Sequence, residues 1–516
     1  MIISKTNKRI VLNLQYPNRV LTTVPTARMF KYKGHDLVAV PHNIDETQVL
    51  RNMGFKVPSP IETQYGWPGR FTPMASQLET SAFLSVNNRA FCLSQMGTGK
   101  TVSVLWAYDF LRQQGSVRKM LVVSPLSTLE RTWADEVFNH FPHLSTSVVH
   151  GSKERRIRML RADVDIYIIN HDGVKVMEKE LISRTDIDVV TIDELASFRN
   201  ASTDRWKAIN RVIAGRKRVW GLTGTPTPNA PTDAWAQCRL ISPERVPKFA
   251  GAFRDATMRQ VSQFKWVPKD TATDTVHQAM QPSIRFMRKD CMDLPPCVYQ
   301  PRHVDMSTEQ KKAYREMMTS LYTEVQTGKI QAVNEAVKMQ KLVQIACGAV
   351  YTQGGGSVLV PSQSRIAETI EIIEQAGSKT IVYVPFTNAL EAVAKELSKK
   401  FTVEIINGST SKSARDVIIR DFQYRSDPQV LVAAAGAISH GVTLTAASVI
   451  VWYAPVTSAE IYTQASDRIT RPGQTLSQLI VNIEGSPVER KLYAALKDRQ
   501  AMEGLLLKLV AEQEDC

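Results

Sequence analysis

Short apolar runs rich in β-branched residues alternate with amphipathic helical segments along most of the chain after about residue 70. Strands that are apolar on both faces and separated by helices are typical of parallel sheets. The runs fall into two series, so the sequence predicts an α/β fold with two parallel-sheet lobes. The first series comprises residues 119–124, 165–169, 187–193 and 217–222, and the second comprises 379–384, 402–406, 429–433, 448–453 and 478–483.

Helical periodicity fills the intervals between these runs. Apolar residues at spacings of three and four predict a helix over 386–401 that packs on the second sheet. A helical insertion is expected at about 307–347, at the start of the second lobe. The prolines of DLPPC at 293–297 predict a hinge, because proline breaks helices. A last helix, with Leu492, Leu496, Arg499, Met502, Leu506 and Leu509 on one side, is expected to dock on the second lobe.

The charge distribution singles out the N-terminal region. The 516 residues carry a net charge of +14, and seven basic but no acidic residues lie within 1–35. Aromatic residues are interleaved with them, which suits contact with nucleic-acid phosphates and bases; a solvated, partly β-structured arm is the other interpretation. A short strand and helix are expected at 40–55 and a linker at 57–69. The predicted divisions are a small basic domain at 1–65, lobe one at 66–293 and lobe two at 294–516.

Other classes of protein are disfavoured by composition. The six cysteines form no CxxC pair, so zinc-ribbon and disulfide scaffolds are not expected. No apolar run approaches the roughly 18–20 residues of a membrane span, and the N-terminal region lacks the apolar segment of a signal peptide. We therefore expect an intracellular, cytoplasmic protein with no membrane partner.

The strongest local motif is LSQMGTGKT at 93–101, between a short apolar run and a helical segment. Strand, glycine-rich turn and helix form the setting of a phosphate-binding loop. Gly97 and Gly99 would let backbone amides surround an anionic oxygen, while Lys100 would reach the β- and γ-phosphates and Thr101 would bind Mg²⁺. The full pattern has glycine six residues before the lysine, where this chain has Ser94.

A second motif, VVTIDELASF at 189–198, ends an apolar strand with two carboxylates. Asp193 is predicted to hold Mg²⁺ through water and Glu194 to orient and deprotonate the attacking water. The following segment GLTGTPTPN, residues 221–229, suits a relay between a γ-phosphate sensor and a second site, or a simple turn. In lobe two, QASDRITRPGQ at 464–474 carries Arg468 and Arg471, expected on one helix face by their spacing of three.

Together these motifs resemble the Swi/Snf type of superfamily-two helicase-like ATPases, and the resemblance covers nearly the whole chain after residue 65. FMRKDCMDLPP and NGSTSKSARDVIIRDF separate this branch from ordinary strand-separating helicases. GVTLTAA and the small size of the chain resemble annealing helicases and compact phage or bacterial relatives within the family. The landmarks, in the family's order, lie at 76–84, 96–101, 122–133, 169–174, 192–200, 222–229, 286–296, 344–350, 381–393, 407–422, 440–455 and 464–474.

The resemblance implies two RecA-like lobes with ATP between them, and a role for each matching residue. Gln77 would read the adenine, the loop including Thr98 would hold the phosphates, and Gln464 would reach ATP from the second lobe. Arg468 and Arg471 would be an arginine-finger pair. The positions near the DNA backbone would be Ser127, Asn170, Gly408 and Thr443.

Two departures put local details in question. Ala196 stands where the family's acidic box usually has histidine, and residues 436–439 replace its Arg-Ala-Gly-Gly stretch. The function implied is that of a monomeric ATP-dependent translocase on duplex or branched DNA, active in remodelling, branch migration or annealing within repair or recombination, in a bacterial or phage-infected cell. The alternatives left open are a true 3′-to-5′ strand-separating helicase and a nucleotide-gated DNA clamp without turnover.

Overall fold

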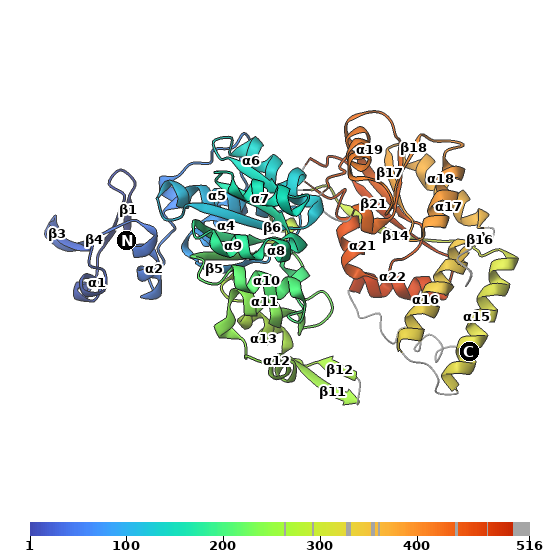
Figure 1. The fold of residues 1–516 in the computed structure, drawn as a ribbon, viewed down its shortest axis with the longest axis horizontal. Coiled ribbons are helices and arrows are strands. Elements are labelled where there is room, and N and C mark those ends of the chain that lie inside the picture. Colours follow the sequence, from blue (N-terminus) through green and yellow to red (C-terminus); the bar gives the residue numbers. More distant parts are fainter. Residues whose placement is uncertain are drawn as a thin grey trace. The chain divides into compact units, whose positions relative to one another are not determined.

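The computed structural model describes residues 1–262, 265–291, 294–326, 332–351, 357–359, 362–438, 442–471 and 473–498. Contacts divide the chain into two compact units, Met1–Cys291 and Met292–Cys516. Figure 1 labels their helices and strands, with colours from blue to green in the first unit and from yellow to red in the second. Among the described residues, none of the helices has the length and apolarity that crossing a bilayer requires.

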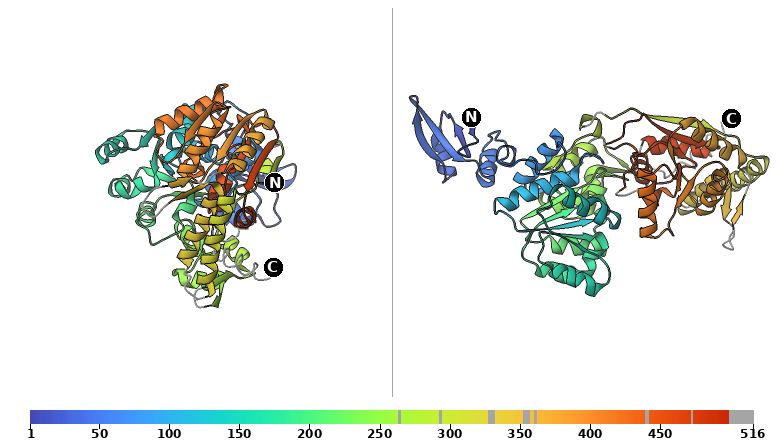
Figure 2. Two further views of the ribbon diagram at one scale, coloured as in Figure 1. Left: turned by 90° about the vertical axis from the view of Figure 1, so that its right-hand side faces the viewer. Right: turned by 90° about the horizontal axis from the view of Figure 1, so that it is seen from above.

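The first unit opens with a four-stranded antiparallel sheet in the order β1-β2-β4-β3 (blue in Figures 1 and 2). Apolar residues on one face of this sheet pack against two helices and form a core of their own. The helix expected within 40–55 is confirmed in α2, whereas the strand expected there lies mostly before it, since β4 ends at Pro41. The elements are β1 (Ile2–Ser4), β2 (Arg9–Leu12), α1 (Pro17–Thr23), β3 (Arg28–Tyr32), β4 (His35–Pro41) and α2 (Ile44–Asn52).

The linker expected at 57–69 was a wrong prediction. This stretch contains helix α3 (Ile61–Gln64), and Val57 and Ile61 are buried. Ile61 packs into the core of the large sheet that follows, and α3 contacts α4 (Ala75–Val86). The prolines and glycines therefore shape a packed connection, because its apolar side chains are covered by the lobe.

The large sheet of the first unit has seven strands in the order β13-β5-β10-β9-β6-β8-β7, all parallel. The four predicted strands are confirmed as β6, β8, β9 and β10. Strands β7 and β13 were not predicted, since one is only partly buried and the other has two residues. The bounds are β5 (Arg89–Cys92), β6 (Lys119–Ser124), β7 (Thr146–Val149), β8 (Ile166–Asn170), β9 (Ile187–Ile192), β10 (Arg218–Leu222) and β13 (Ser283–Ile284).

Helices cover both faces of this sheet, which explains its uniformly apolar strands. One core holds Val122 and Trp220 with side chains of α4 and α5, and the other holds Val123 and Val219 with side chains of α10 and α11. Successive residues of a strand thus contribute to opposite cores. The helices of this lobe include α5 (Lys100–Gln113), α6 (Asp135–His140), α7 (Lys153–Arg161), α8 (His171–Val176), α9 (Glu178–Ser183), α10 (Asp204–Val212), α11 (Asp233–Ile241), α12 (Ala250–Thr257) and α13 (Ala272–Ala279).

The second unit contains a six-stranded sheet in the order β14-β21-β20-β17-β19-β18, again parallel. All five predicted strands are confirmed, and the additional edge strand β14 is mostly exposed. The predicted α/β fold with two parallel-sheet lobes is therefore correct. The bounds are β14 (Cys297–His303), β17 (Lys379–Tyr383), β18 (Val403–Ile406), β19 (Val430–Ala433), β20 (Ala447–Trp452) and β21 (Gln478–Glu484).

The predicted helices of this unit are also found. The insertion expected at 307–347 forms α15 (Thr308–Gln326) and α16 (Ala332–Cys347), and the amphipathic segment forms α18 (Thr387–Leu397). Helix α22 (Pro487–Asp498) buries Leu492 and Leu496 against the sheet as expected. The remaining expected positions of that last helix, Arg499, Met502, Leu506 and Leu509, lie outside the described residues.

Candidate functional site

The glycine-rich loop at 93–99 connects the carboxyl end of β5 to the first turn of α5. Gly97 and Gly99 have φ values of 83° and 75°, a left-handed conformation that residues with a Cβ rarely adopt. Gly99 is the N-cap of α5, a helix of 14 residues whose first amides have no partner within the helix. Oriented amides and the helix dipole make this turn suited to bind an anion.

Lys100 folds back over the loop that precedes it. Its Nζ donates to the backbone oxygens of Ser94 at 2.8 Å and Gln95 at 2.9 Å. The hydroxyl of Thr98 also donates to the Gln95 oxygen, at 2.8 Å. The ammonium group therefore lies over the curled backbone, where a phosphate group would meet it together with the amides.

Ser94, the departure from the full phosphate-loop pattern, ties the loop to a distant segment. Its buried hydroxyl accepts a hydrogen bond from the Phe286 amide at 3.0 Å. The side-chain oxygen of Gln95 accepts another from the Arg288 amide at 2.8 Å. The FMRKD segment thus runs beside the loop, so the serine serves an anchoring contact that glycine could not make.

Gln77 lies against the loop from helix α4. Its side chain is 3% exposed, and its Oε1 accepts the Met74 amide at 2.8 Å at the start of that helix. A Cβ at Gly99 would overlap the side-chain amide of Gln77. The absence of a side chain at Gly99 therefore lets Gln77 approach, while adenine recognition by Gln77 stays a prediction.

Asp193 and Glu194 follow the carboxyl end of β9. The two Asp193 carboxylate oxygens accept hydrogen bonds from the Trp133 indole at 3.0 Å and the Glu194 amide at 3.0 Å. Burial raises the pKa of the Asp193 carboxyl, while the indole and the Lys100 ammonium oppose that shift. The interaction with Lys100 brings the two motifs into one electrostatic site.

Glu194 adopts a left-handed backbone with φ of 49°, which is unusual for a residue with a Cβ. Such a conformation costs on the order of 1 kcal/mol and persists where the surroundings impose it. Here Asp193 donates its amide to the Val123 oxygen at 2.8 Å, and the following 3₁₀ turn (Leu195–Phe198) is buried. The turn therefore takes the backbone out of the path of β9 directly after Asp193.

Sequence reasoning assigned no role to two side chains beside Asp193. Trp133 is fully buried and belongs to a one-turn π-helix (Leu129–Ala134), a form that occurs frequently at functional sites. His171 Nε2 lies 2.8 Å from the Asp193 backbone oxygen. The tryptophan ends the segment VVSPLSTLERTW, but only the fold brings it to a carboxylate 60 residues away.

The GLTGTP segment, residues 221–226, begins in the last two residues of β10 and continues beside the phosphate loop. The Thr223 amide donates to the Cys92 oxygen at 3.1 Å, and the Thr225 amide donates to the Thr223 hydroxyl at 3.2 Å. A Cβ on Gly224 would lie 3.5 Å from the Met96 amide nitrogen. A displacement of the phosphate loop would therefore shift this segment by direct contact, as a relay between the γ-phosphate and a second site requires.

In the second unit, the helix expected to carry both arginines ends too early, so that prediction was wrong. Helix α21 spans Ala459–Ser466, and Arg468 and Arg471 lie in the turns after it. Arg468 is completely buried and donates to the backbone oxygens of Gln464 at 2.8 Å and Val442 at 3.1 Å. Arg471 is half-buried, and its Nη1 donates to the Thr443 hydroxyl at 3.3 Å.

Gln464 is 2% exposed, and its side-chain amide donates to Glu460 at 3.1 Å. Arg471, which is predicted to reach ATP, therefore contacts Thr443, which is predicted to lie near the DNA backbone. Both residues belong to the second lobe. The finger role of the two arginines and the role of Gln464 stay predictions.

The other predicted DNA residues lie in loops. Ser127 is in a 3₁₀ turn (Leu126–Thr128) after β6, and Asn170 ends β8, the strand beside it. Asn170 accepts a hydrogen bond from Arg156 at 3.0 Å. Both lie at the same edge of the sheet as the phosphate loop. Gly408 is in the turn after β18, between Asn407 and Thr410, whose side chains close that turn.

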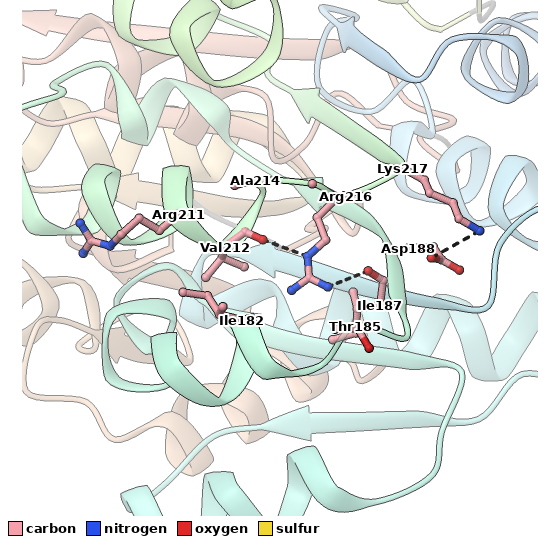
Figure 3. Close-up of a pocket in the computed structure, with 10 residues that line it drawn as sticks. Ile182, Thr185, Ile187, Asp188, Arg211, Val212, Ala214, Arg216 and Lys217 are labelled. Carbon is pink, nitrogen blue, oxygen red and sulfur yellow. Dashed lines mark hydrogen bonds and ion pairs between the residues drawn. The ribbon is translucent and has the colours of Figure 1, made fainter.

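A pocket of about 150 Å³ lies at the opposite edge of the first sheet, around the starts of β9 and β10 (Figure 3). Its Arg216 donates to the backbone oxygens of Val212 at 2.9 Å and Ile187 at 2.9 Å, and Lys217 lies 3.5 Å from Asp188. These charged groups already have protein partners. The pocket is therefore a structural feature and lies away from the strand ends where α/β sheets bind ligands.

The family of the chain follows from comparisons with known proteins. A model of the SNF2-related domain matches residues 85–349, and a model of the helicase conserved C-terminal domain matches residues 364–473. The chain belongs to the SNF2-related family. The resemblance inferred from the motifs is thereby confirmed, and the two parallel-sheet lobes are the RecA-like lobes of that family.

Individual relatives are distant. Putative protein p41 of Acyrthosiphon pisum secondary endosymbiont phage 1 is 25% identical, over 78% of this chain and 90% of that protein. The SWI/SNF-related matrix-associated actin-dependent regulator of chromatin subfamily A-like protein 1 of Xenopus laevis is 24% identical over 76% of this chain. This chain spans 40% of that relative's length. A Sulfolobus solfataricus SWI2/SNF2 ATPase core in complex with dsDNA matches 84% of this chain and 92% of that chain, at 21% identity and a TM-score of 0.43.

ATP with Mg²⁺ is the ligand that membership of this family implies, and the first unit offers suitable residues. The left-handed glycines, the α5 amides and Lys100 suit a polyphosphate. A hydroxyl at Thr101, in the first turn of α5, and a carboxylate at Asp193 are oxygen donors of the kind that Mg²⁺ takes alongside water. Within the described residues there is no cluster of three or more His, Cys, Asp and Glu side chains that could hold a metal by themselves. The donor set therefore fits a cation shared with phosphate oxygens.

Proposed function

We propose that this chain is an ATP-driven motor that moves along duplex or branched DNA. Membership of the SNF2-related family supports ATP hydrolysis and DNA binding in general. The observation that carries the proposal is the convergence of the phosphate loop, Lys100 and Asp193 at the carboxyl edge of one sheet. Remodelling, branch migration or annealing of DNA are the outcomes that such movement would serve.

The residues of the first unit would divide the chemistry of hydrolysis. The loop amides and Lys100 would bind and orient the phosphates, with Gln77 positioned for the adenine. Mg²⁺, held by Thr101 and Asp193 through water, would neutralise charge on the phosphate oxygens. Glu194, with its backbone turned out of the strand, would accept a proton from the attacking water.

The second unit would complete the reaction. Arg471 would stabilise the charge that develops on the γ-phosphate, as arginine fingers do. Arg468, which is buried and bound to backbone oxygens of its own lobe, would position the segment that carries Arg471. ATP would then favour closure of the two lobes, hydrolysis would release it, and alternating grip at Ser127, Asn170, Gly408 and Thr443 would produce steps.

The names of two relatives support annealing and translocation as activities of the proposed motor. One human relative is named DNA annealing helicase and endonuclease ZRANB3, and one from Bacillus subtilis is named putative ATP-dependent helicase/translocase YwqA. This chain spans 36% and 47% of their lengths, so activities of their further parts are not carried over. Plain 3′-to-5′ unwinding remains the alternative.

ATPase assays across duplex, single-stranded, forked and four-way DNA test the proposal most directly. We expect duplex or branched DNA to stimulate turnover, together with displacement of a third strand from a triplex and no separation of a plain duplex. Unwinding of a 3′-tailed duplex would favour the helicase alternative. ATP binding without turnover on any DNA would instead indicate a nucleotide-gated clamp.

A further inference from the structure

Among the described residues, one face of the small N-terminal sheet, here named the open face, contributes no side chain to the core that the sheet forms with its helices. Residues directly opposite in an antiparallel pair share a face, and alternate residues of a strand point to opposite faces. Phe30 pairs with Leu37, Tyr32 with His35 and Arg28 with Ala39, so all six lie on one side of the sheet. The pairing of β2 with β4 adds Arg9 and Val11 to that side.

The other face of the same sheet is the one that packs. Ile10, Leu12, Val38 and Val40 are at most 2% exposed and form a core with residues from α1 and α2. On the open face, Phe30 is 37% and Tyr32 is 57% exposed, and the edge strand that carries them is exposed along its whole length. Two aromatic rings therefore stand on the open face of an edge strand, about 7 Å apart along it.

The open face carries basic side chains and lacks acidic ones, whereas the packed face carries one residue of each sign, Lys31 and Asp36. Arg9, Arg28 and His35 lie on the open face, and the one acidic residue of the four strands, Asp36, pairs with Lys31 on the packed face. Lys33 follows Tyr32 in the turn, with its ammonium 5.5 Å from the centre of the tyrosine ring. The open face thus combines exposed rings with positive charge and carries no carboxylate.

We propose that the open face binds single-stranded DNA, with unpaired bases stacked on Phe30 and Tyr32 and phosphates near Arg9 and Arg28. Antiparallel sheets with exposed rings on neighbouring alternate positions serve this purpose, because every base offers an aromatic face. Bases inside a duplex are already stacked on each other, so this surface selects unpaired segments. The proposal rests on the DNA motor proposed above. The open face would let that motor recognise branched DNA by its unpaired segments.

The test compares full-length wild type with Phe30→Ala/Tyr32→Ala. Binding is measured at one fixed salt concentration to three probes of equal phosphate number: a thymidine oligonucleotide, the same oligonucleotide without bases, and a duplex. Loss of both rings should weaken binding to the thymidine strand at least tenfold. Binding to the abasic strand and to the duplex should change less than twofold, because the arginines remain.

Met29→Ala is the matched control, since Met29 belongs to the same strand, is 52% exposed and points to the packed face. It should leave all three affinities unchanged. If the alanine pair lowers the melting temperature, Phe30→Leu/Tyr32→Leu keeps apolar bulk and should still lose the preference for the strand with bases.

Equal affinities of wild type and both ring variants for the thymidine strand would overturn the proposal. An equal loss of affinity for all three probes would also overturn the proposal. Such a loss would mean that the rings only hold the basic side chains in place and do not stack on bases. Duplex-stimulated ATPase, measured on the same samples, distinguishes this failure from failure of the motor. Retained stimulation with unchanged single-strand binding would refute only the open-face proposal.

Discussion

Glu194 and Lys100 illustrate how two residues of one site can have separable tasks. Lys100 lies over the phosphate loop through its two bonds to backbone oxygens, whereas Glu194 is turned out of the end of β9 by a left-handed backbone. The first arrangement serves binding of charge and the second serves chemistry on a water molecule. Their substitution should therefore affect different steps.

We predict that Lys100→Ala loses tight ATP binding, while Glu194→Gln binds ATP but hydrolyses it slowly. Removing a cation from the phosphates should weaken binding by about tenfold or more, because hydrogen bonds to charged groups contribute roughly 1.5–3 kcal/mol. Glutamine keeps the size of glutamate but cannot accept the proton. Nucleotide titrations and single-turnover rates separate the two effects. Near-normal turnover by Glu194→Gln would remove its proposed role.

Trp133 is predicted to position the Asp193 carboxylate through its indole hydrogen bond of 3.0 Å. Mg²⁺ should increase the affinity of wild type for an ATP analogue, and Trp133→Phe should reduce the size of that increase by about tenfold. The reason is that the variant loses a hydrogen bond to a charged group. Trp220→Phe is the control, because Trp220 lies fully buried in the same core and donates to the Asn87 backbone oxygen at 3.0 Å. Both variants should lose similar thermal stability. Equal Mg²⁺ responses in the two would contradict the positioning role.

At the scale of elements, periodicity in the sequence locates what is long and buried. The interior strands of both sheets were predicted to within about one residue, because burial on both faces leaves uninterrupted apolar runs. Strand β14 was missed because it is an exposed edge with Pro301 in it. The packed stretch around Ile61 was taken for a linker because its burial depends on a lobe that the local sequence does not describe.

In the candidate site too, residues with a local sequence signature could be predicted, whereas contacts between distant segments could not. Lys100 and Asp193 could be found because glycine-rich loops and strand-end carboxylates have local signatures. Trp133 beside Asp193 and Phe286 beside Ser94 could not, since each contact joins segments far apart in sequence. The helix predicted through Arg471 failed because it ends at Ser466: Pro472 disfavours helical backbone only at Arg471, and a spacing of three residues does not by itself show where a helix stops.

The turns after α21 give the two arginines different surroundings, so their variants should differ. Arg471→Ala should leave nucleotide affinity and melting temperature nearly intact but reduce turnover by about 10³-fold. Arg468→Ala removes bonds to two backbone oxygens from a fully buried position and should also lower the melting temperature, by roughly 5 °C or more. Calorimetry with steady-state kinetics checks both. An unchanged melting temperature for Arg468→Ala would contradict its structural role.

At the scale of the whole molecule, the N-terminal region is joined to the first lobe by packing as well as by the chain. Ile44 and Ile61 belong to the core of the large sheet, and the Gln48 side chain donates to the Val86 oxygen at 2.6 Å. Tyr65 donates to Asp109, a fully buried residue of the helix that begins at the phosphate loop. Removing residues 1–65 would therefore expose part of the lobe.

A fragment of residues 1–291 should fold and bind ATP weakly, because it holds the phosphate loop, Asp193 and the packing of α2 and α3. It should hardly hydrolyse ATP with or without DNA, since Arg468 and Arg471 belong to the other unit. A fragment of residues 66–291 is the matched comparison and should melt at a lower temperature or be insoluble, because the apolar surface that Ile44 and Ile61 cover would be exposed to water. Thermal melts, nucleotide titrations and ATPase rates of both fragments check these outcomes. DNA-stimulated hydrolysis by residues 1–291 alone would contradict a mechanism in which the second unit supplies the arginine that completes the site.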